Sequence, residues 1–281
     1  MSANILNGKN LAASIRMQLK ETIDTLNVKP HLAIVLAGNN EASKIYVRNK
    51  IKAADEMGIK TTLYNFDDSI TQNELETLIH NLNQDNSVNG IMVQLPLPSN
   101  INETKILDII SPYKDVDGFH PYNIGLLQNN SKEAVIAATP KGILRILEEY
   151  NIELSGKNAL VIGRSQIVGK PVAMLLLNKN STVTIAHSRT RDLESLIKQA
   201  DVIVSACGCP KLIKGSSIKE GAVVIDVGIN HVDGKICGDV DFESAVEKAS
   251  YITPVPGGVG PMTIAMLLEN TFLAYKRQNK I

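Results

Sequence analysis

The segment NALVIGRSQIVGKP, residues 158–171, decides the fold, because its pattern predicts a buried strand, a tight turn and the start of a helix. Gly163 and Gly169 stand in the turn, and the small Ser165 lies between them. Such a turn can bring backbone N–H groups and a helix N-terminus toward a pyrophosphate. The spacing departs from G-x-G-x-x-G, since Ser165 replaces the second glycine and the third comes one residue late. Taken alone, the segment is a weak indication of a dinucleotide site.

The same alternation of strands and helices extends along the chain in both directions. Apolar runs that predict strands are HLAIVLAG, TTLYNF and GIMVQLPLP before this segment, and TVTIAH, DVIVSA and AVVIDVGIN after it. Helical or loop segments separate these runs, which is the pattern of βαβ units and a parallel sheet. The predicted fold class is α/β with two lobes, an N-terminal α/β domain and a Rossmann-like domain, with a cleft between them.

The boundary between the two lobes is predicted near Thr139-Pro140, a pair typical of a helix N-cap followed by proline at the first helical position. The first domain is then expected to span residues 1–139, and the second residues 140–261. Residues 262–281 predict an amphipathic helix that packs back on the first domain.

The composition favours a small-molecule ligand. The 281 residues are 44% hydrophobic and 21% charged, and 29 Lys and Arg balance 29 Asp and Glu, so neither nucleic acid nor a membrane is expected as a partner. Cys207, Cys209 and Cys237 are odd in number and lack C-x-x-C spacing, so neither a disulfide framework nor a metal site is predicted. The N-terminus has no apolar signal region and no run of about 18 apolar residues occurs, so a cytoplasmic protein is expected.

The end of the predicted strand TVTIAH indicates which dinucleotide binds. A fold that selects NAD presents an acidic residue there to the ribose 2′-hydroxyl, whereas this chain continues with His187 and Ser188. A serine hydroxyl with Arg164, Arg189 or Arg191 nearby suits a 2′-phosphate, because guanidinium pairs well with phosphate oxygens. NADP is therefore the predicted cofactor, although each arginine by itself could equally be a solvated loop charge.

In the first lobe, the segment SKIYVRNK carries a polar stripe along one helix. Ser43, Tyr46 and Lys50 fall at i, i+3 and i+7 and share a face, while Ile45 and Val47 are expected to bury other parts of the helix. Tyrosine offers a ring for a planar heterocycle. Lysine can transfer protons if burial lowers its pKa. The alternative is an exposed lysine beside a half-packed tyrosine.

Three further motifs follow predicted strands, where open α/β sheets bind ligands. In VQLPLP, two prolines end the strand and leave Gln94 as a polar group in an apolar run. In KDVDG, Asp117 could accept hydrogen bonds from a pterin or purine. In TPVPGGVGPMT, residues 253–263, prolines make the path rigid and glycines allow close approach to a flat ring. A structural glutamine, a turn aspartate and a stiff linker are the respective alternatives.

Together these motifs resemble the methylenetetrahydrofolate dehydrogenase/cyclohydrolase family of one-carbon metabolism. The resemblance rests on an ordered series that spans nearly the whole chain: SKIYVRNK, VQLPLP, KDVDGFHP, ATPKG, VIGRSQIVGKP, GDVDF and PVPGGVGPMT. It implies NADP-dependent oxidation of 5,10-methylenetetrahydrofolate to the 5,10-methenyl form, and hydrolysis of that product to 10-formyltetrahydrofolate. It also implies a homodimer, a folate-binding catalytic first domain and an NADP-binding second domain.

The resemblance assigns roles to the residues above. It implies that Lys50 transfers protons in the hydrolysis, Gln94 tunes it, Tyr46 lies against the folate rings and Asp117 holds the pterin. The expected catalytic residues are Lys50, Tyr46, Gln94 and Asp117; the expected substrate-binding residues are Ser43, Tyr46, Asp117, Pro256, Gly257 and Gly258; the expected cofactor-binding residues are Gly163, Arg164, Ser165, Ser188 and Ile229.

Two positions depart from the family pattern. Many relatives carry a cysteine where this chain has Ala138, and Cys207 and Cys209 stand where small or polar residues are expected. Neither departure removes a proposed catalytic group. Two alternatives to the bifunctional enzyme remain at this stage: a dehydrogenase without useful hydrolysis, against which Lys50 argues, and a non-catalytic NADP-binding sensor.

Overall fold

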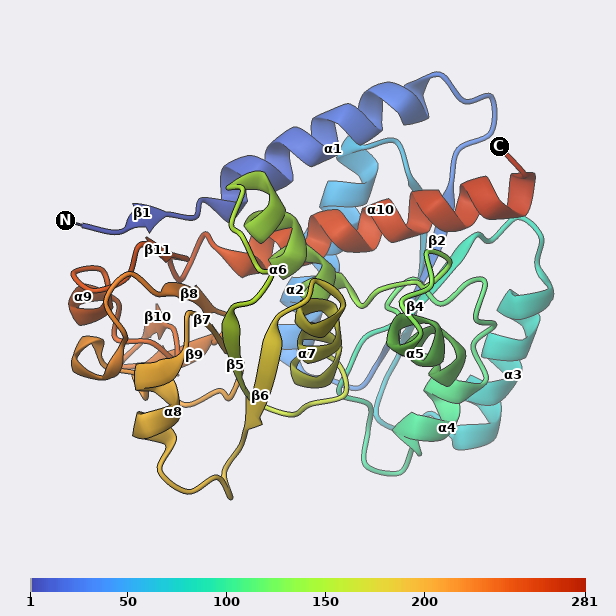
Figure 1. Cartoon of the computed structure of the whole chain (residues 1–281). Helices are drawn as coiled ribbons and strands as arrows, with labels where there is room; N and C mark the ends of the chain where they lie inside the picture. The colour runs from blue at the N-terminus through green and yellow to red at the C-terminus, as the bar shows by residue number, and fades with distance from the viewer. Residues whose placement is uncertain (1) are drawn as a thin grey trace. The chain divides into compact units, whose positions relative to one another are not determined.

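The computed structural model describes residues 2–281 and divides the chain into two compact units (Figure 1). Unit 1 comprises the N-terminal segment to Ala13 together with Thr139–Thr263, and unit 2 comprises Ser14–Ala138 with Ile264–Ile281. The N-terminal segment therefore groups with the second half of the chain, whereas residues 1–139 were expected to form one domain. The assignment of a functional domain to each of the predicted ranges stays a prediction. No helix among residues 2–281 is long and apolar enough to cross a membrane.

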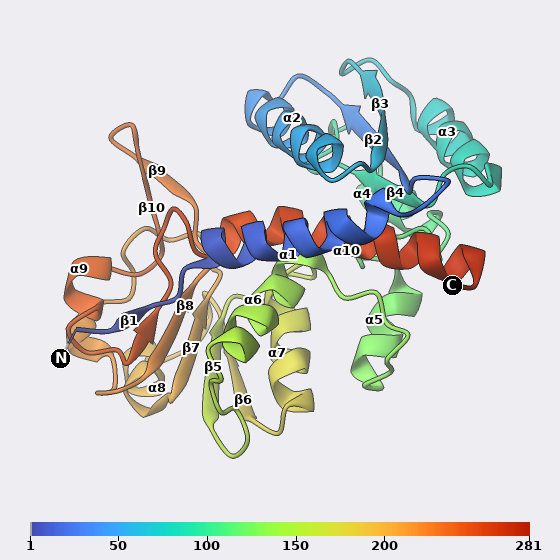
Figure 2. The same cartoon turned by 90° about the horizontal axis from the view of Figure 1, so that it is seen from above.

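Unit 2 is built on a parallel sheet with the strand order β3-β2-β4. The strands are β2 (His31–Ala37), β3 (Lys60–Phe66) and β4 (Gly90–Val93). All residues of β2 and β4 are buried, as the continuous apolar runs predict for strands covered on both faces. Figure 2 shows α2 (Glu41–Glu56) and α3 (Gln72–Gln84) on opposite faces of this sheet.

Alternation along β4 decides which side chains meet each helix. Ile91 and Val93 belong to the hydrophobic core that Leu75 and Ile79 of α3 also enter. Met92 points the other way, toward α2, because successive residues of a strand face opposite sides. The next residue on that side is Gln94, directly after the strand ends.

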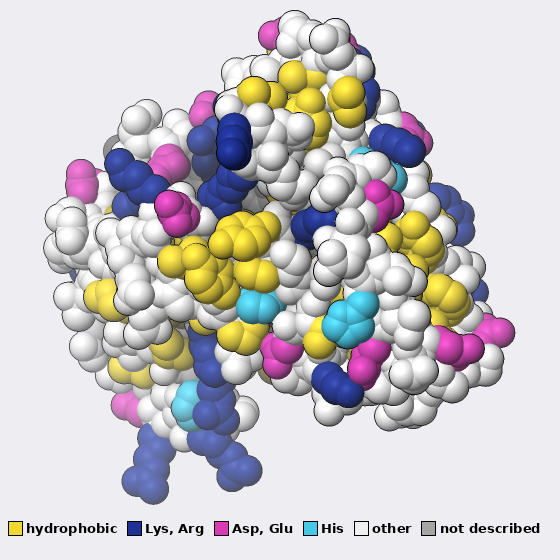
Figure 3. All heavy atoms as spheres, turned by 90° about the vertical axis from the view of Figure 1, so that its right-hand side faces the viewer, with side chains coloured by type: hydrophobic (Ala, Val, Ile, Leu, Met, Phe, Trp, Pro, Cys, Tyr) yellow, Lys and Arg dark blue, Asp and Glu magenta, His cyan; other side chains and the backbone are white. Residues whose placement is uncertain are grey.

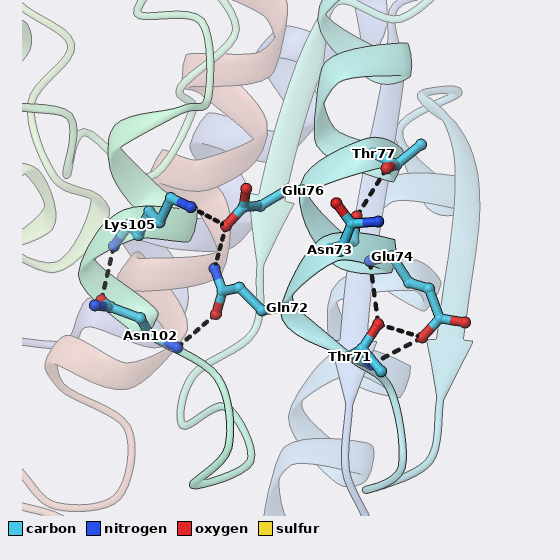
Figure 4. Close-up of polar contacts among 8 residues, drawn as sticks. All are labelled: Thr71, Gln72, Asn73, Glu74, Glu76, Thr77, Asn102 and Lys105. Carbon is cyan, nitrogen blue, oxygen red and sulfur yellow. Dashed lines mark hydrogen bonds and ion pairs between the residues drawn. The ribbon is translucent and has the colours of Figure 1, made fainter.

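Polar contacts cap α3 and connect it to the next helix of unit 2 (Figure 4). Thr71 and Glu74 form a capping box at the start of α3, in which each side chain accepts a backbone N–H of the other. Gln72 accepts the backbone N–H of Asn102 at 2.7 Å, and Asn102 is the N-cap of α4 (Glu103–Asp108). Glu76 pairs with Lys105 at 2.7 Å. These contacts join α3 to α4.

The rest of unit 2 is helical or irregular. α5 (Pro121–Gln128) follows the KDVDGFH segment, and most of α1 (Gly8–Asp24) and of α10 (Val259–Asn279) belongs to this unit. Asn270 of α10 donates hydrogen bonds to the backbone oxygens of Val116 and Ile136, both at 2.9 Å. The C-terminal helix therefore contacts the first lobe through a buried amide.

Unit 1 contains a six-stranded sheet with the order β1-β11-β8-β7-β5-β6, in which every pairing is parallel. Its strands are β1 (Asn4–Ile5), β5 (Asn158–Ile162), β6 (Thr182–Ala186), β7 (Val202–Ser205), β8 (Val223–Asp226) and β11 (Tyr251–Ile252). β1 pairs with β11, which is why the N-terminal segment joins this unit. The predicted Rossmann-like sheet is present.

Helices and a hairpin complete unit 1: α6 (Ala138–Glu149), α7 (Gly169–Asn178), α8 (Leu193–Gln199), the 3₁₀ turn η1 (Gly215–Ser217), α9 (Phe242–Ala245), β9 (Asn230–Val232) and β10 (Lys235–Cys237). The hairpin extends away from the sheet in Figure 2. The predicted start of α6 is two residues late, because the helix begins at Ala138 rather than Pro140 and Thr139 lies inside the first turn instead of at the N-cap. Its hydroxyl instead contacts that of Thr263 at 2.9 Å.

Candidate active site

Helix α2 carries the first group of predicted site residues. Its N-cap Asn40 accepts the backbone N–H of Ser43 at 3.0 Å, which sets the start of the helix. Ser43 is buried, whereas Tyr46 is 43% exposed, so its ring is accessible to a ligand. Val47 is buried as expected, but Ile45 is 53% exposed, so the prediction that Ile45 helps to bury the helix is wrong. Its position two residues before Val47 turns it toward solvent.

Lys50 extends from α2 to the end of β4. Its Nζ donates a hydrogen bond to Gln94 Oε1 at 3.0 Å and lies 3.3 Å from Met92 Sδ. The Gln94 amide is held in this orientation, because its Nε2 donates to the backbone oxygen of Leu95 at 2.7 Å. The apolar run therefore ends in an amide that presents its oxygen to the lysine.

The amine and a nearby carboxyl have strongly altered proton affinities. Burial lowers the pKa of Lys50 below its ordinary value, and the charge of Asp117 partly opposes that change. Burial raises the pKa of Asp117 to about 7, against the attraction of Lys50, and the charge of Asp115 adds to the rise. None of the residues 2–281 donates a hydrogen bond to the Asp117 carboxyl, which can therefore accept donors from a ligand.

Asp115 sets the path of the backbone around Asp117. Its carboxylate accepts the backbone N–H groups of Gly118, Phe119 and His120 at 2.9, 3.2 and 2.9 Å, and the side chain of Asn123 at 2.8 Å. A Cβ on Gly118 would lie 2.6 Å from the nitrogen of Ala137, and its φ of 73° also requires glycine. The loop that carries Asp117 is thus rigid.

The sequence interpretation missed Asp115 and Lys114, which also support this loop. Lys114 is buried and donates to the backbone oxygens of Leu82 and Asp85 at 2.9 and 2.7 Å, at the C-terminal end of α3. An aspartate three residues before a glycine is a recognised turn signal that could have identified Asp115. Lys114 had no such signal, because its partners come from another element.

In unit 1, the turn between β5 and α7 is tightly packed. Gly163 has a φ of 126°, and a Cβ there would overlap the backbone of Ala206. A Cβ on Gly169 would overlap the backbone of Gly163, so the helix approaches the strand as closely as the motif predicts. Ser165 has a structural contact: its Oγ accepts the N–H groups of Val168 and Gly169, both at 3.2 Å. Those two donors at the start of α7 are therefore already in use.

The turn after β6 lies beside this one. A cavity of about 470 Å³ is lined by Ile162, Gly163, Arg164, His187, Ser188, Thr190, Leu193, Ala206, Cys207, Cys209 and Leu212. Three of the predicted cofactor residues, Gly163, Arg164 and Ser188, come together there, whereas Ser165 and Ile229 are not in the lining. Dark-blue Lys and Arg side chains project together at the lower end of Figure 3, the level at which Figure 1 places the turn after β6.

The loop that contains Pro256 is anchored within unit 1. Gly257 has a φ of 107° and its oxygen accepts the N–H of Lys9 at 2.9 Å. A Cβ on Gly258 would lie 2.6 Å from the oxygen of Pro254. These contacts fix the backbone of residues 254–258, which agrees with the rigid loop predicted from its prolines and glycines.

Comparison with known proteins identifies the family. Residues 6–117 match the family model of the tetrahydrofolate dehydrogenase/cyclohydrolase catalytic domain. Residues 137–279 match the model of the tetrahydrofolate dehydrogenase/cyclohydrolase NAD(P)-binding domain. The chain belongs to the tetrahydrofolate dehydrogenase/cyclohydrolase family. A curated relative, the bifunctional protein FolD of Sulfurihydrogenibium, is 54% identical over 98% of each chain.

Two solved structures of this family have the same fold. The bifunctional FolD enzyme of Campylobacter jejuni is 49% identical with a TM-score of 0.97, and the match covers 100% of each chain. The Trypanosoma brucei dehydrogenase-cyclohydrolase, solved as a complex with NADP cofactor and inhibitor, is 38% identical with a TM-score of 0.96 over 100% of each chain. The resemblance found in the motifs is therefore confirmed over the full length.

The residues of the 470 Å³ cavity fit NADP, the cofactor bound in the Trypanosoma brucei structure. None of the described residues that line it is acidic, so no carboxylate opposes a 2′-phosphate, and Arg164 and Ser188 offer a charged and a neutral donor. The volume lies within the range of about 300–1,000 Å³ that is usual for small-molecule sites. Among residues 2–281, no cluster of three or more His, Cys, Asp or Glu is placed to hold a metal ion.

Proposed function

We propose that this chain oxidises 5,10-methylenetetrahydrofolate with NADP and hydrolyses the 5,10-methenyl product to 10-formyltetrahydrofolate. The observation that carries the proposal is the Lys50–Gln94 hydrogen bond of 3.0 Å beside a carboxyl with a pKa of about 7. Family membership over the full chain supports both activities. The proposal covers both reactions and the roles of the residues that carry them.

Lys50 is the proposed proton carrier of the hydrolysis. Because burial lowers its pKa, a larger share of the amine is neutral than in an exposed lysine, and the neutral amine can take a proton from the water that adds to the methenyl carbon. The resulting ammonium returns the proton to the folate nitrogen N5 as the bond between that nitrogen and the carbon breaks. The added oxygen loses its remaining proton and becomes the formyl oxygen, so the overall reaction releases one proton.

Gln94, Asp117, Ser43 and Tyr46 are proposed to hold Lys50 and the folate. Gln94 directs the amine through its oxygen and, as a neutral group, does not raise the pKa of Lys50 as a carboxylate would. The Asp117 carboxyl has no hydrogen-bond donor among residues 2–281, and it is proposed to accept the N–H groups of the pterin. The exposed Tyr46 ring is proposed to stack on the folate, with Pro256, Gly257 and Gly258 as further contacts.

The oxidation is proposed to need positioning rather than acid or base chemistry. A folate nitrogen lone pair expels hydride from the one-carbon bridge, and bound NADP supplies the hydride acceptor. Arg164 and Ser188 are proposed to hold the 2′-phosphate. Gly163 would allow close approach of the pyrophosphate, and Ser165 keeps the turn in place through its two hydrogen bonds. Ile229 is proposed as a further contact of the cofactor.

The biological setting is part of the same proposal. We infer a homodimer in the cytoplasm that supplies 10-formyltetrahydrofolate for purine biosynthesis, with functional domains at residues 1–139 and 140–261. The family likeness supports these inferences. Light scattering of the purified chain tests the dimer, since a monomer at micromolar concentration would contradict it.

One assay tests the reaction itself. Purified protein is given 5,10-methylenetetrahydrofolate with NADP or with NAD, and reduced cofactor and the methenyl chromophore are followed together. Reduced cofactor without matching methenyl accumulation is the expected result, with NADP preferred. Reduction with full methenyl accumulation would leave a dehydrogenase only, and no reduction with either cofactor would leave a binding protein.

A further inference from the structure

A buried carboxylate in unit 1 links two loops of the sheet edge and has no part in the function described so far. Asp239, in the segment GDVDF, is fully buried. Its Oδ2 accepts Ser205 Oγ at 3.1 Å and the backbone N–H groups of Cys207 and Gly208 at 2.9 and 3.1 Å. Its Oδ1 accepts Asn230 Nδ2 at 2.9 Å. One side chain therefore holds the loop after β7 and the loop after β8.

Asp226 places Asp239 for this task. Asp226 is the last residue of β8, and its Oδ1 accepts the N–H groups of Gly228 and Asp239 at 2.9 and 3.0 Å. Its Oδ2 accepts the N–H of Val240 at 2.9 Å. An added Cβ on Gly228 would overlap the Asp239 carboxylate, and one on Gly238 would overlap that of Asp226. The Asp239 carboxylate thus packs against the backbone of Gly228, and the Asp226 carboxylate packs against the backbone of Gly238.

A third loop is tied to the same pair. The N–H of Asp226 donates to Thr253 Oγ1 at 2.7 Å, and Thr253 is fully buried at the start of the loop that contains Gly257. Thr253, Asp226 and Ser205 all lie at the carboxyl ends of parallel strands, β11, β8 and β7. In open α/β sheets this is the edge that binds the ligand.

The strand order indicates which half of the dinucleotide lies over these loops. The ribose that carries the 2′-phosphate binds at the end of the strand next to the glycine-rich turn, which here is β6. β7 and β8 lie on the other side of β5. A dinucleotide that crosses the turn at Gly163 therefore reaches the β7 and β8 loops with its nicotinamide half.

We propose that Asp239 is a positioning residue for hydride transfer, which holds the β7 and β8 loops where they orient the nicotinamide half of NADP. This inference rests on the proposed function. The state of the neighbouring groups agrees with it: burial raises the pKa of the Cys207 thiol to about 12, so the thiol stays protonated and donates to Asp239 Oδ2 at 3.3 Å. No described Lys, Arg or His forms an ion pair with either carboxylate, so backbone and side-chain donors alone hold them.

The test compares Asp239→Asn with Asp241→Asn in the full-length protein. Asp241 lies in the same GDVDF segment, but its carboxylate accepts Ser244 Oγ at 2.7 Å at the start of α9 and pairs with the exposed Lys211 at 3.8 Å. Three quantities are measured: kcat of the dehydrogenase with NADP, the Kd of adenosine 2′,5′-bisphosphate, and kcat of the cyclohydrolase with methenyl substrate. The second probe carries only the half of the cofactor that binds at β6, and the third depends on Lys50 in unit 2.

For Asp239→Asn we expect dehydrogenase kcat to fall by about 10- to 100-fold, because displaced loops misalign the ring. The Kd of adenosine 2′,5′-bisphosphate should rise by a smaller factor, because Cys207 also lines the 470 Å³ cavity, and cyclohydrolase kcat should not change. Asp241→Asn should change none of the three. Ser205→Ala, which removes one donor to Asp239, should lower dehydrogenase kcat in the same direction by a smaller factor. Unchanged dehydrogenase in Asp239→Asn would overturn the inference.

Comparable losses in all three measurements, with both kcat values lowered and the Kd raised by a similar factor, would also overturn it, since that would mark Asp239 as a general structural residue. Absence of dehydrogenase activity in the unmodified protein is a different result. It would reject the proposed function, because the reference reaction itself would be missing.

Discussion

The two units place ionisable groups in opposite roles. In unit 2, Lys50 and Asp117 are half-buried and have altered pKa values, and the Asp117 carboxyl has no hydrogen-bond donor among the described residues. In unit 1, burial likewise raises the pKa of Asp226, to about 6, but both of its oxygens and those of Asp239 accept hydrogen bonds from loops.

This difference separates a group proposed to react from a scaffold. A buried carboxyl whose acceptor sites are open can bind and respond to a ligand, whereas one whose acceptors are occupied holds the backbone in place. Hydrolysis of a methenyl group requires proton movement, and hydride transfer requires alignment. The perturbed pKa alone does not distinguish the two cases; the hydrogen-bond partners do.

The largest expected effect comes from removal of the amine in unit 2. Lys50→Met should lower cyclohydrolase kcat by about 10²- to 10⁴-fold, the usual contribution of a positioned acid or base, and leave NADP binding intact. Lys52→Met, at an exposed position of the same helix, is the matched control. Hydrolysis of added methenyl substrate measures the effect, and an unchanged rate would reject Lys50 as the proton carrier.

A carboxylate in unit 1 should change cofactor choice by a smaller factor. Ser188→Glu places a negative charge in the lining of the 470 Å³ cavity, where like-charge repulsion of several kcal/mol should lower the preference for NADP over NAD by about 100-fold. The ratio of kcat/KM for the two cofactors measures it. Ser155→Glu, an exposed position outside this cavity, serves as control, and an unaltered ratio in Ser188→Glu would place the 2′-phosphate elsewhere.

Gln94→Glu should shift a pH profile rather than abolish activity. A carboxylate at hydrogen-bond distance from Nζ stabilises the ammonium and raises the pKa of Lys50. In the proposed mechanism the neutral amine takes the proton from water, so cyclohydrolase kcat rises with pH through that pKa, and the rising limb should move to higher pH. A limb that moves to lower pH would show that the neutral amine is not the active form.

Asp117→Asn should produce a smaller shift of opposite sign. The charge of Asp117 opposes the lowering of the Lys50 pKa by burial, so its removal lowers this pKa further and moves the rising limb to lower pH. The profile of kcat is measured at saturating substrate, because the variant should also bind folate less tightly. Asp55→Asn, exposed on α2, is the control, and a limb that stays in place would separate Asp117 from Lys50.

Much of the fold follows from local pattern. The continuous apolar runs of β2, β4 and β5 predict strands covered on both faces, and parallel sheets need such coverage. The errors are positional: α6 begins two residues before the predicted Pro140, and Ile45 is exposed although it is apolar. Helix ends and faces depend on what packs against them, which periodicity does not specify.

The candidate site was only partly predictable. Lys50 and Gln94 were named as a pair from the family motifs, and the structure has their side chains 3.0 Å apart. Ser165 was expected to bind the cofactor, and the structure has its hydroxyl accepting two backbone N–H groups at the start of α7. Asp239 was quoted within GDVDF without a function, because its partners are 9 to 34 residues away in the chain.

By itself the sequence determined the fold class, the family and the residue types able to move protons or bind phosphate, because these properties depend on pattern and local chemistry. Only the tertiary structure decided which carboxylates can accept hydrogen bonds from a ligand and which already accept them from the protein backbone and side chains. Asp117 and Asp239 occur in similar D-V-D segments, KDVDG and GDVDF. Their difference lies in the donors that distant loops bring to Asp239 and do not bring to Asp117, and solvation and hydrogen bonding by distant groups are set only when the chain is folded.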